Sequence, residues 1–259
     1  MTTPAITRRE RRAEQREVAK ESGRRRRAHT QRSGLRSPFV LATAGALVAG
    51  VLLIGALVLT NRPASSGAAV LPAEVPSVQA AFVHGRALGD PNAPVTIELW
   101  SDFQCPVCER FATTLEPRLR TTYVADGRVR LVYRDFAFLG LESTDAAAGA
   151  RIAEELGAGF WPFHDLLYAN HAGENLGAFS RDRLTDIAAA AGLDRTAFAT
   201  ALKDPRHVLA VNQETGQGHA LGVNSTPTLV INGTVYPGLP DWAKLTAVLD
   251  ALVGERTTP

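Results

Sequence analysis

The chain has 259 residues, of which 45% are apolar and 21% are charged. This size and composition suit one packed domain with an extension, and they exclude a chain that is disordered throughout. The net charge of +2 is unevenly distributed, because residues 1–37 carry twelve Lys or Arg against four Asp or Glu.

The first 37 residues are rich in Arg and poor in apolar side chains, which predicts a disordered basic tail. An uncharged apolar run of 21 residues follows at positions 39–59. A helix of that length spans about 30 Å, the thickness of the hydrocarbon core of a bilayer. We therefore expect a single transmembrane signal-anchor helix over residues 38–60. The basic flank predicts a cytoplasmic N-terminus and an extracytoplasmic remainder.

Two alternatives remain open for this region. The small residues at 64–68 are typical of a cleavage site, so a cleaved signal peptide competes with a retained anchor. A basic tail also suits nucleic-acid binding, but its place beside a membrane segment favours a topology signal and attraction to anionic lipids. We expect no nucleic-acid partner. Residues 61–79, rich in Pro, Ala and Ser, predict a linker.

A compact domain is expected over residues 80–259. The predicted elements are, in chain order, a strand at 95–100, a helix at 106–119, a strand at 129–133, helices from 143 to 204, a hairpin of strands at 228–231 and 234–236, and a helix at 241–252. We expect Pro117 to kink or end the first helix and Asp241 to cap the last. Glycines at 157, 159, 173 and 192 predict breaks within the helical region. The order indicates an α/β sheet with a helical insertion.

The two cysteines, Cys105 and Cys108, lie three positions apart where the first strand gives way to a helix. Free N–H groups and the helix dipole at such a start favour negative charge, so a thiol there ionises more readily. Pro106 suits the first helical position. Cys108 lies one turn further on the same face, which permits a two-step exchange of disulfides with a partner.

The sequence favours a structural or zinc-binding role for the two cysteines less than a redox role. A bridge across so short a loop is a poor structural staple. A zinc site needs two further ligands, and the sequence has no second cysteine pair and no close pair of histidines to supply them. Two inert structural thiols remain an alternative. We expect redox chemistry with no metal and no cofactor.

Four segments together resemble DsbA-like thioredoxin-fold proteins, in particular their bacterial membrane-anchored branch. They are LGDPNAP at 88–94, WSDFQCPVC at 100–108, FWPFHDLLYAN at 160–170 and GVNSTPT at 222–228. The resemblance covers about residues 80–255. It implies a thioredoxin fold with an inserted helical subdomain at about 141–205. It also implies a thiol–disulfide oxidoreductase whose site comprises Cys105, Pro106, Val107 and Cys108, faced by Thr226 and Pro227.

The resemblance further implies that the Thr226–Pro227 bond is cis, although most X–Pro bonds are trans and an ordinary trans proline is the alternative. In that arrangement the Thr226 backbone would pair with an extended substrate strand. Many relatives carry a buried Glu six residues before the first cysteine, but this position holds Leu99. Its neighbour Glu98 should face the other side of the strand. Asp102 is a possible substitute, but a loop-capping role is favoured.

Three residues with aromatic rings lie within these segments. His164 lies in the insertion and is predicted to be packed rather than to line a groove. Trp161 lies beside it, and Trp100 is expected in the core or in a groove wall.

The direction of exchange is less strongly indicated. We expect an oxidase that introduces disulfides into exported cysteine-containing proteins and is reoxidised by a membrane quinone-linked partner, as the resemblance implies. A reductase or isomerase of the same fold is the alternative. Isomerases of this kind carry a separate dimerisation domain, whereas only a linker stands at 61–79, so a monomer is expected. The Pro-Val dipeptide lacks the histidine of the strongest oxidants, which predicts a less extreme reduction potential.

Overall fold

The computed structural model describes residue 50, residues 69–73 and residues 79–257. Apart from residue 50, the described residues belong to one compact unit. The predicted basic tail lies outside the described residues, and so does the predicted transmembrane helix apart from residue 50. Within the described ranges, no helix is long and apolar enough to cross a membrane.

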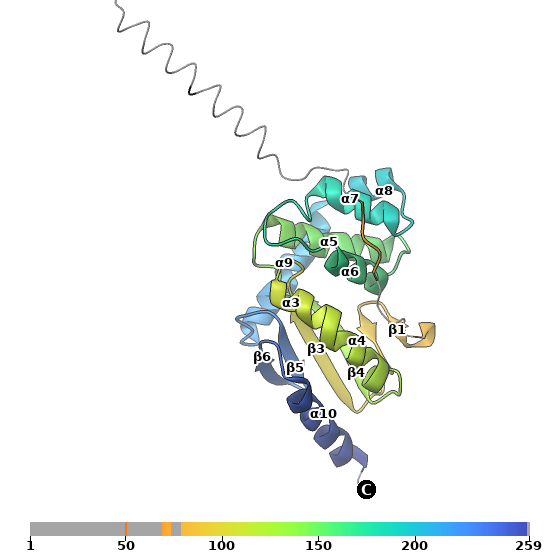
Figure 1. Ribbon diagram of the computed structural model, residues 1–259, viewed down its shortest axis with the longest axis vertical. Coiled ribbons are helices and arrows are strands. Elements are labelled where there is room, and N and C mark those ends of the chain that lie inside the picture. Colours follow the sequence, from red (N-terminus) through yellow and green to blue (C-terminus); the bar gives the residue numbers. More distant parts are fainter. Residues whose placement is uncertain (1–49, 51–68, 74–78, 258–259) are drawn as a thin grey trace, which may run out of the picture. The chain divides into compact units, whose positions relative to one another are not determined.

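The described residues form a mixed sheet with the strand order β1-β2-β4-β3-β5-β6 (Figure 1). Its strands are β1 (Val83–His84), β2 (Ala87–Leu88), β3 (Val95–Ser101), β4 (Val129–Asp135), β5 (Thr228–Ile231) and β6 (Thr234–Pro237). β3 and β4 are parallel, and each of the other neighbouring pairs is antiparallel. The predicted strands are confirmed, while the short β1–β2 hairpin was not predicted.

Both faces of the sheet carry buried apolar residues, which form the main core on one face and a smaller cluster on the other. Ile97 and Leu99 of β3 belong to the main core, which also holds Leu245 and Leu249 of α10 (Trp242–Thr257). Trp100 points to the other face and packs there with Phe136, Val223 and Val230. The prediction that Trp100 is a core residue is therefore confirmed, with only 2% of its surface exposed.

The helix after β3 is longer than predicted. α3 (Pro106–Arg110), η2 (Phe111–Leu115), α4 (Glu116–Leu119) and η3 (Arg120–Val124) follow one another without a break, and η2 and η3 are π-helical turns. The prediction that the helix ends at 119 is wrong. Pro117 lies in the first turn of α4, directly after a π-helical turn, where a missing N–H group is tolerated.

The helical insertion is confirmed. It consists of α5 (Leu141–Glu155), α6 (Phe160–Ala169), α7 (Arg181–Ala190) and α8 (Arg195–Ala201), which lie together at one end of the sheet in Figure 1. The predicted breaks fall where the backbone has positive φ, at Gly157, Gly159, Gly173 and Gly192. Glycine adopts this conformation without the steric cost that a side chain would bring.

A further long helix, α9 (Pro205–Ala220), was not predicted. Asp204 caps it by accepting a hydrogen bond from the Arg206 backbone N–H at 3.0 Å, and Pro205 occupies its first turn. α9 lies behind the sheet in Figure 1, on the side opposite α3 and α4. Its Gly218 faces the rings of Trp100 and Phe136, so the helix backbone approaches the sheet closely there.

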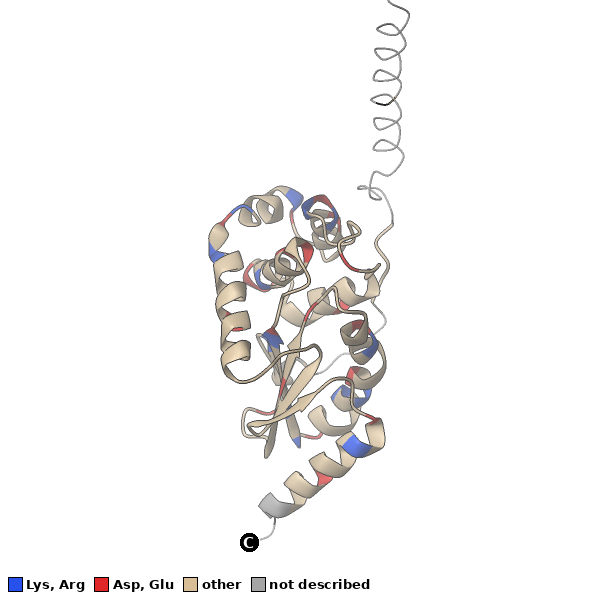
Figure 2. Ribbon diagram, turned by 90° about the vertical axis from the view of Figure 1, so that its left-hand side faces the viewer, with Lys and Arg blue, Asp and Glu red and all other residues tan. Residues whose placement is uncertain are grey.

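Ion pairs tie α9 to the sheet and to α5. Glu214 of α9 accepts hydrogen bonds from Arg86 at 3.1 Å and from Arg151 at 2.7 Å, and Arg151 also bonds Asp135 at 2.7 Å. Burial raises the pKa of Glu214, but the hydrogen bond and charge of Arg86 outweigh this effect and lower the pKa of Glu214 to about 2. Burial raises the pKa of Asp135 to about 6 despite the charges of Arg151 and Arg86. Elsewhere on the described surface, charges of both signs are interspersed along the helices (Figure 2).

We predict that Gly218→Ala destabilises the fold. A Cβ atom at this position would lie 2.7 Å from the Phe136 ring and 2.8 Å from the Trp100 ring. Overpacking of this kind costs about 1–3 kcal/mol, which exceeds the gain of about 1 kcal/mol that alanine brings to a helix interior. Urea unfolding followed by tryptophan fluorescence measures the change.

Gly216→Ala is the matched control, because no heavy atom lies within 4 Å of a Cβ there. This variant should be unchanged or more stable by up to about 1 kcal/mol. If Gly218→Ala raised the unfolding midpoint as much as Gly216→Ala, the close contact between α9 and the sheet would be disproved.

Candidate active site

Cys105 is the N-cap residue of α3, directly after the loop that leaves β3. Its N–H group donates to the Asp102 carbonyl at 3.1 Å, and its carbonyl accepts from the Glu109 N–H at 3.0 Å. Pro106 is exposed and Val107 is half-buried. The predicted position at a helix start is confirmed, and the backbone N–H groups of Cys108 and Val107 in this first turn help to lower the pKa of Cys105.

The segment before β5 completes the site from a distant part of the sequence. β5 pairs antiparallel with β3, and Thr228 lies opposite Trp100, so the preceding residues reach the start of α3. The Thr226–Pro227 peptide bond is cis, as predicted. The Cys105 thiol donates to the Thr226 carbonyl at 3.5 Å. The structure therefore brings the predicted residues of the two segments together.

The two sulfurs have different environments. Cys105 is 7% exposed and Cys108 is 1% exposed, and both are free thiols. The hydrogen bond from Cys108 lowers the pKa of Cys105 to about 6 against the opposing effect of burial, with further help from the Thr226 side chain and the backbone N–H groups of α3. Burial, followed by the hydrogen bond and charge of Cys105, raises the pKa of Cys108. Cys105 is therefore suited to attack and Cys108 to act second.

Asp102 holds the loop before Cys105 in shape. Its carboxylate accepts hydrogen bonds from the backbone N–H groups of Gln104 at 2.8 Å, Phe138 at 2.9 Å and Leu139 at 3.1 Å. The favoured prediction of a loop cap is confirmed. Leu99 is buried on the core face, while Glu98 faces the other side and accepts a hydrogen bond from Arg134 at 3.0 Å. The predicted position of Glu98 on the sheet face is also confirmed.

Several supporting residues were missed by the sequence reasoning. Gln104 is fully buried, and its side chain donates to the Ser143 hydroxyl at 2.9 Å while it accepts from the Asn175 N–H at 2.5 Å. His171 Nε2 lies 2.8 Å from the Gln104 carbonyl, to which it donates. These partners come from the insertion. Gln104 directly precedes Cys105 in the sequence, but no sequence pattern indicated which residues it would contact.

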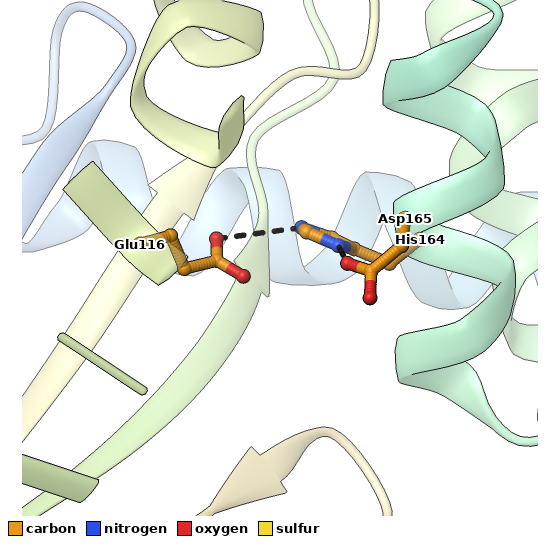
Figure 3. Close-up of side chains that lie close together, drawn as sticks. All are labelled: Glu116, His164 and Asp165. Carbon is orange, nitrogen blue, oxygen red and sulfur yellow. Dashed lines mark hydrogen bonds and ion pairs between the residues drawn. The ribbon is translucent and has the colours of Figure 1, made fainter. Parts of the chain in front are cut away.

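A group of charged side chains lies between α4 and α6 (Figure 3). His164 Nδ1 is 2.8 Å from Asp165 Oδ1, and His164 Nε2 is 3.7 Å from Glu116 Oε2. His164 is fully buried, which confirms the prediction of a packed histidine. Arg120 bonds Glu116 at 2.9 Å and Asp165 at 2.7 Å, and its guanidinium lies over the Trp161 ring. Arg120 therefore already supplies the cationic partner that a metal ion would provide to these carboxylates.

Comparison with known proteins agrees with this geometry. A family model described as thioredoxin matches residues 82–251. The chain belongs to the thioredoxin family. This thioredoxin-family chain is 28% identical over 173 residues to a probable disulfide bond formation protein D of Bacillus cereus, covering 66% of this chain and 79% of that protein.

Two solved structures are similar to this family member. A thioredoxin-like oxidoreductase from Silicibacter pomeroyi superposes with a TM-score of 0.56 at 28% identity, covering 67% of this chain and 94% of that chain. Oxidised BdbD from Bacillus subtilis superposes with a TM-score of 0.61 at 19% identity, covering 71% and 100%. The BdbD superposition shows the shared fold. The family match, the Bacillus cereus relative and the Silicibacter pomeroyi structure support a DsbA-like thiol–disulfide oxidoreductase.

We predict that Cys105 in the reduced protein is alkylated by iodoacetamide with a midpoint near pH 6, because that is about where its pKa lies. The thiolate is present above this pH and is lost as the pH falls through it. Cys108→Ala should move the midpoint upward, since the hydrogen bond from Cys108 is the largest cause of the lowered pKa. A midpoint of about 8.5 in the reduced wild type, the value of an ordinary thiol, would contradict this.

Proposed function

We propose that this chain is an extracytoplasmic oxidase that introduces disulfides into exported cysteine-containing proteins by exchange through Cys105 and Cys108. The observation that carries the proposal is the position of Cys105 at a helix start beside the buried thiol of Cys108, an arrangement that lowers the pKa of Cys105. A thiolate that is stabilised in the reduced form makes the corresponding disulfide easier to reduce, and so a better oxidant.

The exchange proceeds in two displacements. A substrate thiolate attacks Cys105 Sγ of the oxidised enzyme, the Cys105–Cys108 bond breaks, and Cys108 leaves as a thiolate. A second substrate thiolate then attacks the substrate sulfur of the mixed disulfide. Cys105 leaves with the electron pair, and the substrate gains a disulfide while the enzyme gains two electrons.

The surroundings of the pair assist these steps. Pro106 occupies the first helical position, where its missing N–H group leaves no hydrogen bond unmade. Pro106 and Val107 together place Cys108 one helical turn after Cys105. The segment at Thr226 and Pro227 faces Cys105, and the Thr226 backbone would pair with an extended substrate segment.

The location of the reaction rests on the N-terminal sequence and on the relatives. The domain organisation that we propose is a cytoplasmic basic tail at 1–37, a transmembrane anchor at 38–60, a linker at 61–79 and the catalytic domain at 80–259. A relative named probable disulfide bond formation protein D supports an oxidising role.

The proposed partners are exported protein substrates and a membrane quinone-linked thiol reoxidase. The catalytic domain acts as a monomer.

We predict that the Cys108→Ala variant accumulates mixed disulfides with exported proteins in cells, because its Cys105 thiolate attacks substrate disulfides and no Cys108 thiolate is present to attack Cys105 Sγ and release the substrate. Cys105→Ala is the matched control and should trap none, since Cys108 is 1% exposed. Non-reducing gel electrophoresis and mass spectrometry of the adducts provide the measurement.

Purified oxidised full-length protein should also transfer its disulfide to a reduced two-cysteine peptide with near-complete yield. A protein that instead reduces the oxidised peptide, with an equilibrium favouring its own disulfide, would be a reductase. Adducts formed equally by Cys105→Ala would overturn the assignment of Cys105 as the sulfur that exchanges with substrates.

A further inference from the structure

Two buried hydroxyl groups lie next to the sulfur of Cys108. Ser101 is the last residue of β3 and Tyr168 lies on α6, and each is 3% exposed. Their oxygen atoms are 2.8 Å apart, and the Tyr168 hydroxyl also donates to the Asp102 carbonyl at 3.4 Å. The Ser101 hydroxyl interacts with the Cys108 sulfur and partly offsets the effect of burial on the pKa of Cys108. Ser101 therefore lies between Cys108 and the hydroxyl of Tyr168.

Cys108 needs such a partner when the disulfide opens. It then leaves with the electron pair of the broken bond and carries a negative charge, yet only 1% of its surface is exposed. An ion without hydrogen bonds is costly in an interior from which water is excluded. The position six residues before Cys105 holds the apolar Leu99, and the Asp102 carboxylate is occupied by three backbone N–H groups.

We propose that the Ser101 hydroxyl, oriented by Tyr168, stabilises the Cys108 thiolate as it leaves. The inference rests on exchange through the Cys105–Cys108 disulfide and holds for either direction of net electron flow. Ser101 contacts the reacting sulfur and is a catalytic residue, whereas Tyr168 acts through Ser101 and is a positioning residue.

The two hydroxyl groups can serve both protonation states of Cys108, because each hydroxyl can donate one hydrogen bond and accept others. When Cys108 is a thiolate, Tyr168 donates to Ser101 and Ser101 donates to the sulfur. When Cys108 is a thiol, the sulfur donates to Ser101, Ser101 donates to Tyr168, and Tyr168 donates to the Asp102 carbonyl. These hydrogen bonds reverse by rotation of two hydroxyl groups, without any movement of heavy atoms.

The step balances without a further reactant. An attacking thiolate forms a bond to Cys105 Sγ, the Cys105–Cys108 bond breaks, and the electron pair remains on Cys108 Sγ. One disulfide is exchanged for another, and no proton is transferred in the step itself. The hydroxyl groups lower its barrier by solvating the developing charge.

The test is the single-turnover rate at which a fixed concentration of glutathione thiolate opens the disulfide of the oxidised full-length protein. Ser101→Ala should slow this step about tenfold, the effect of one hydrogen bond to a charged group at the lower end of its usual range. Tyr168→Phe keeps the ring and should slow the step about threefold. The double variant should be no slower than Ser101→Ala, because Tyr168 acts through Ser101.

The pKa of Cys108, measured from thiolate absorbance in a Cys105→Ala background, gives a readout that a merely structural role would not move. Ser101→Ala should raise it, and Tyr168→Phe should raise it less. Ser180→Ala removes a helix cap on α7, and Tyr123→Phe removes a hydrogen bond to Asp250. Both controls should stay within twofold of the wild-type rate.

If Ser101→Ala opened at the wild-type rate with an unchanged pKa of Cys108, the proposal would be wrong. The proposal would also be wrong if the double variant were slower than Ser101→Ala, because Tyr168 would then act separately from Ser101. A wild-type protein that forms no Cys105–Cys108 disulfide would instead overturn the proposed function. The two failures are therefore distinguishable.

Discussion

The site depends on a difference between two sulfurs that lie one helical turn apart. Cys105 is at the start of α3, where the Cys108 thiol, the Thr226 side chain and backbone N–H groups together favour its thiolate against the effect of burial. Cys108 is turned into the core, where burial favours the neutral thiol. Because β3 pairs with both β4 and β5, the helix start and the Thr226 segment are fixed by the same strand.

The helical insertion is part of this site as well as a cover for it. His171 and Asn175 lie beyond the end of α6 and contact Gln104, the residue before Cys105. Tyr168 on α6 reaches the Ser101 hydroxyl behind Cys108. The insertion therefore fixes the loop that precedes Cys105 and orients the Ser101 hydroxyl near Cys108. Substitutions in α6 should for this reason alter the redox chemistry even though α6 holds neither cysteine.

The sequence predicted the elements whose signals are local. The β-branched run before Asp102, the Asn-Gly turn at 232 and the glycines of the insertion each act within a few residues, and each was recognised. α9 was missed because Gly216 and Gly218 weaken its helical pattern, while the reason for Gly218 is the distant ring of Trp100. The partnership of Ser101 with Tyr168 was missed for the same reason, since 67 residues separate them. The continuation of the helix past Pro117 depends on π-helical turns that no residue pattern indicated.

The central claim is that Cys105 is a stabilised thiolate in the reduced enzyme, and the reduction potential measured against pH tests it most directly. With a thiolate pKa of about 6, reduction takes up two protons with two electrons below that pH, but only one above it. The potential should therefore fall by about 59 mV per pH unit below pH 6 and by about 30 mV per unit above it. At pH 7 a value of about −120 to −180 mV would match oxidising members of the fold. A value near −270 mV, or a slope of about 59 mV that persists to pH 8.5, would contradict the account.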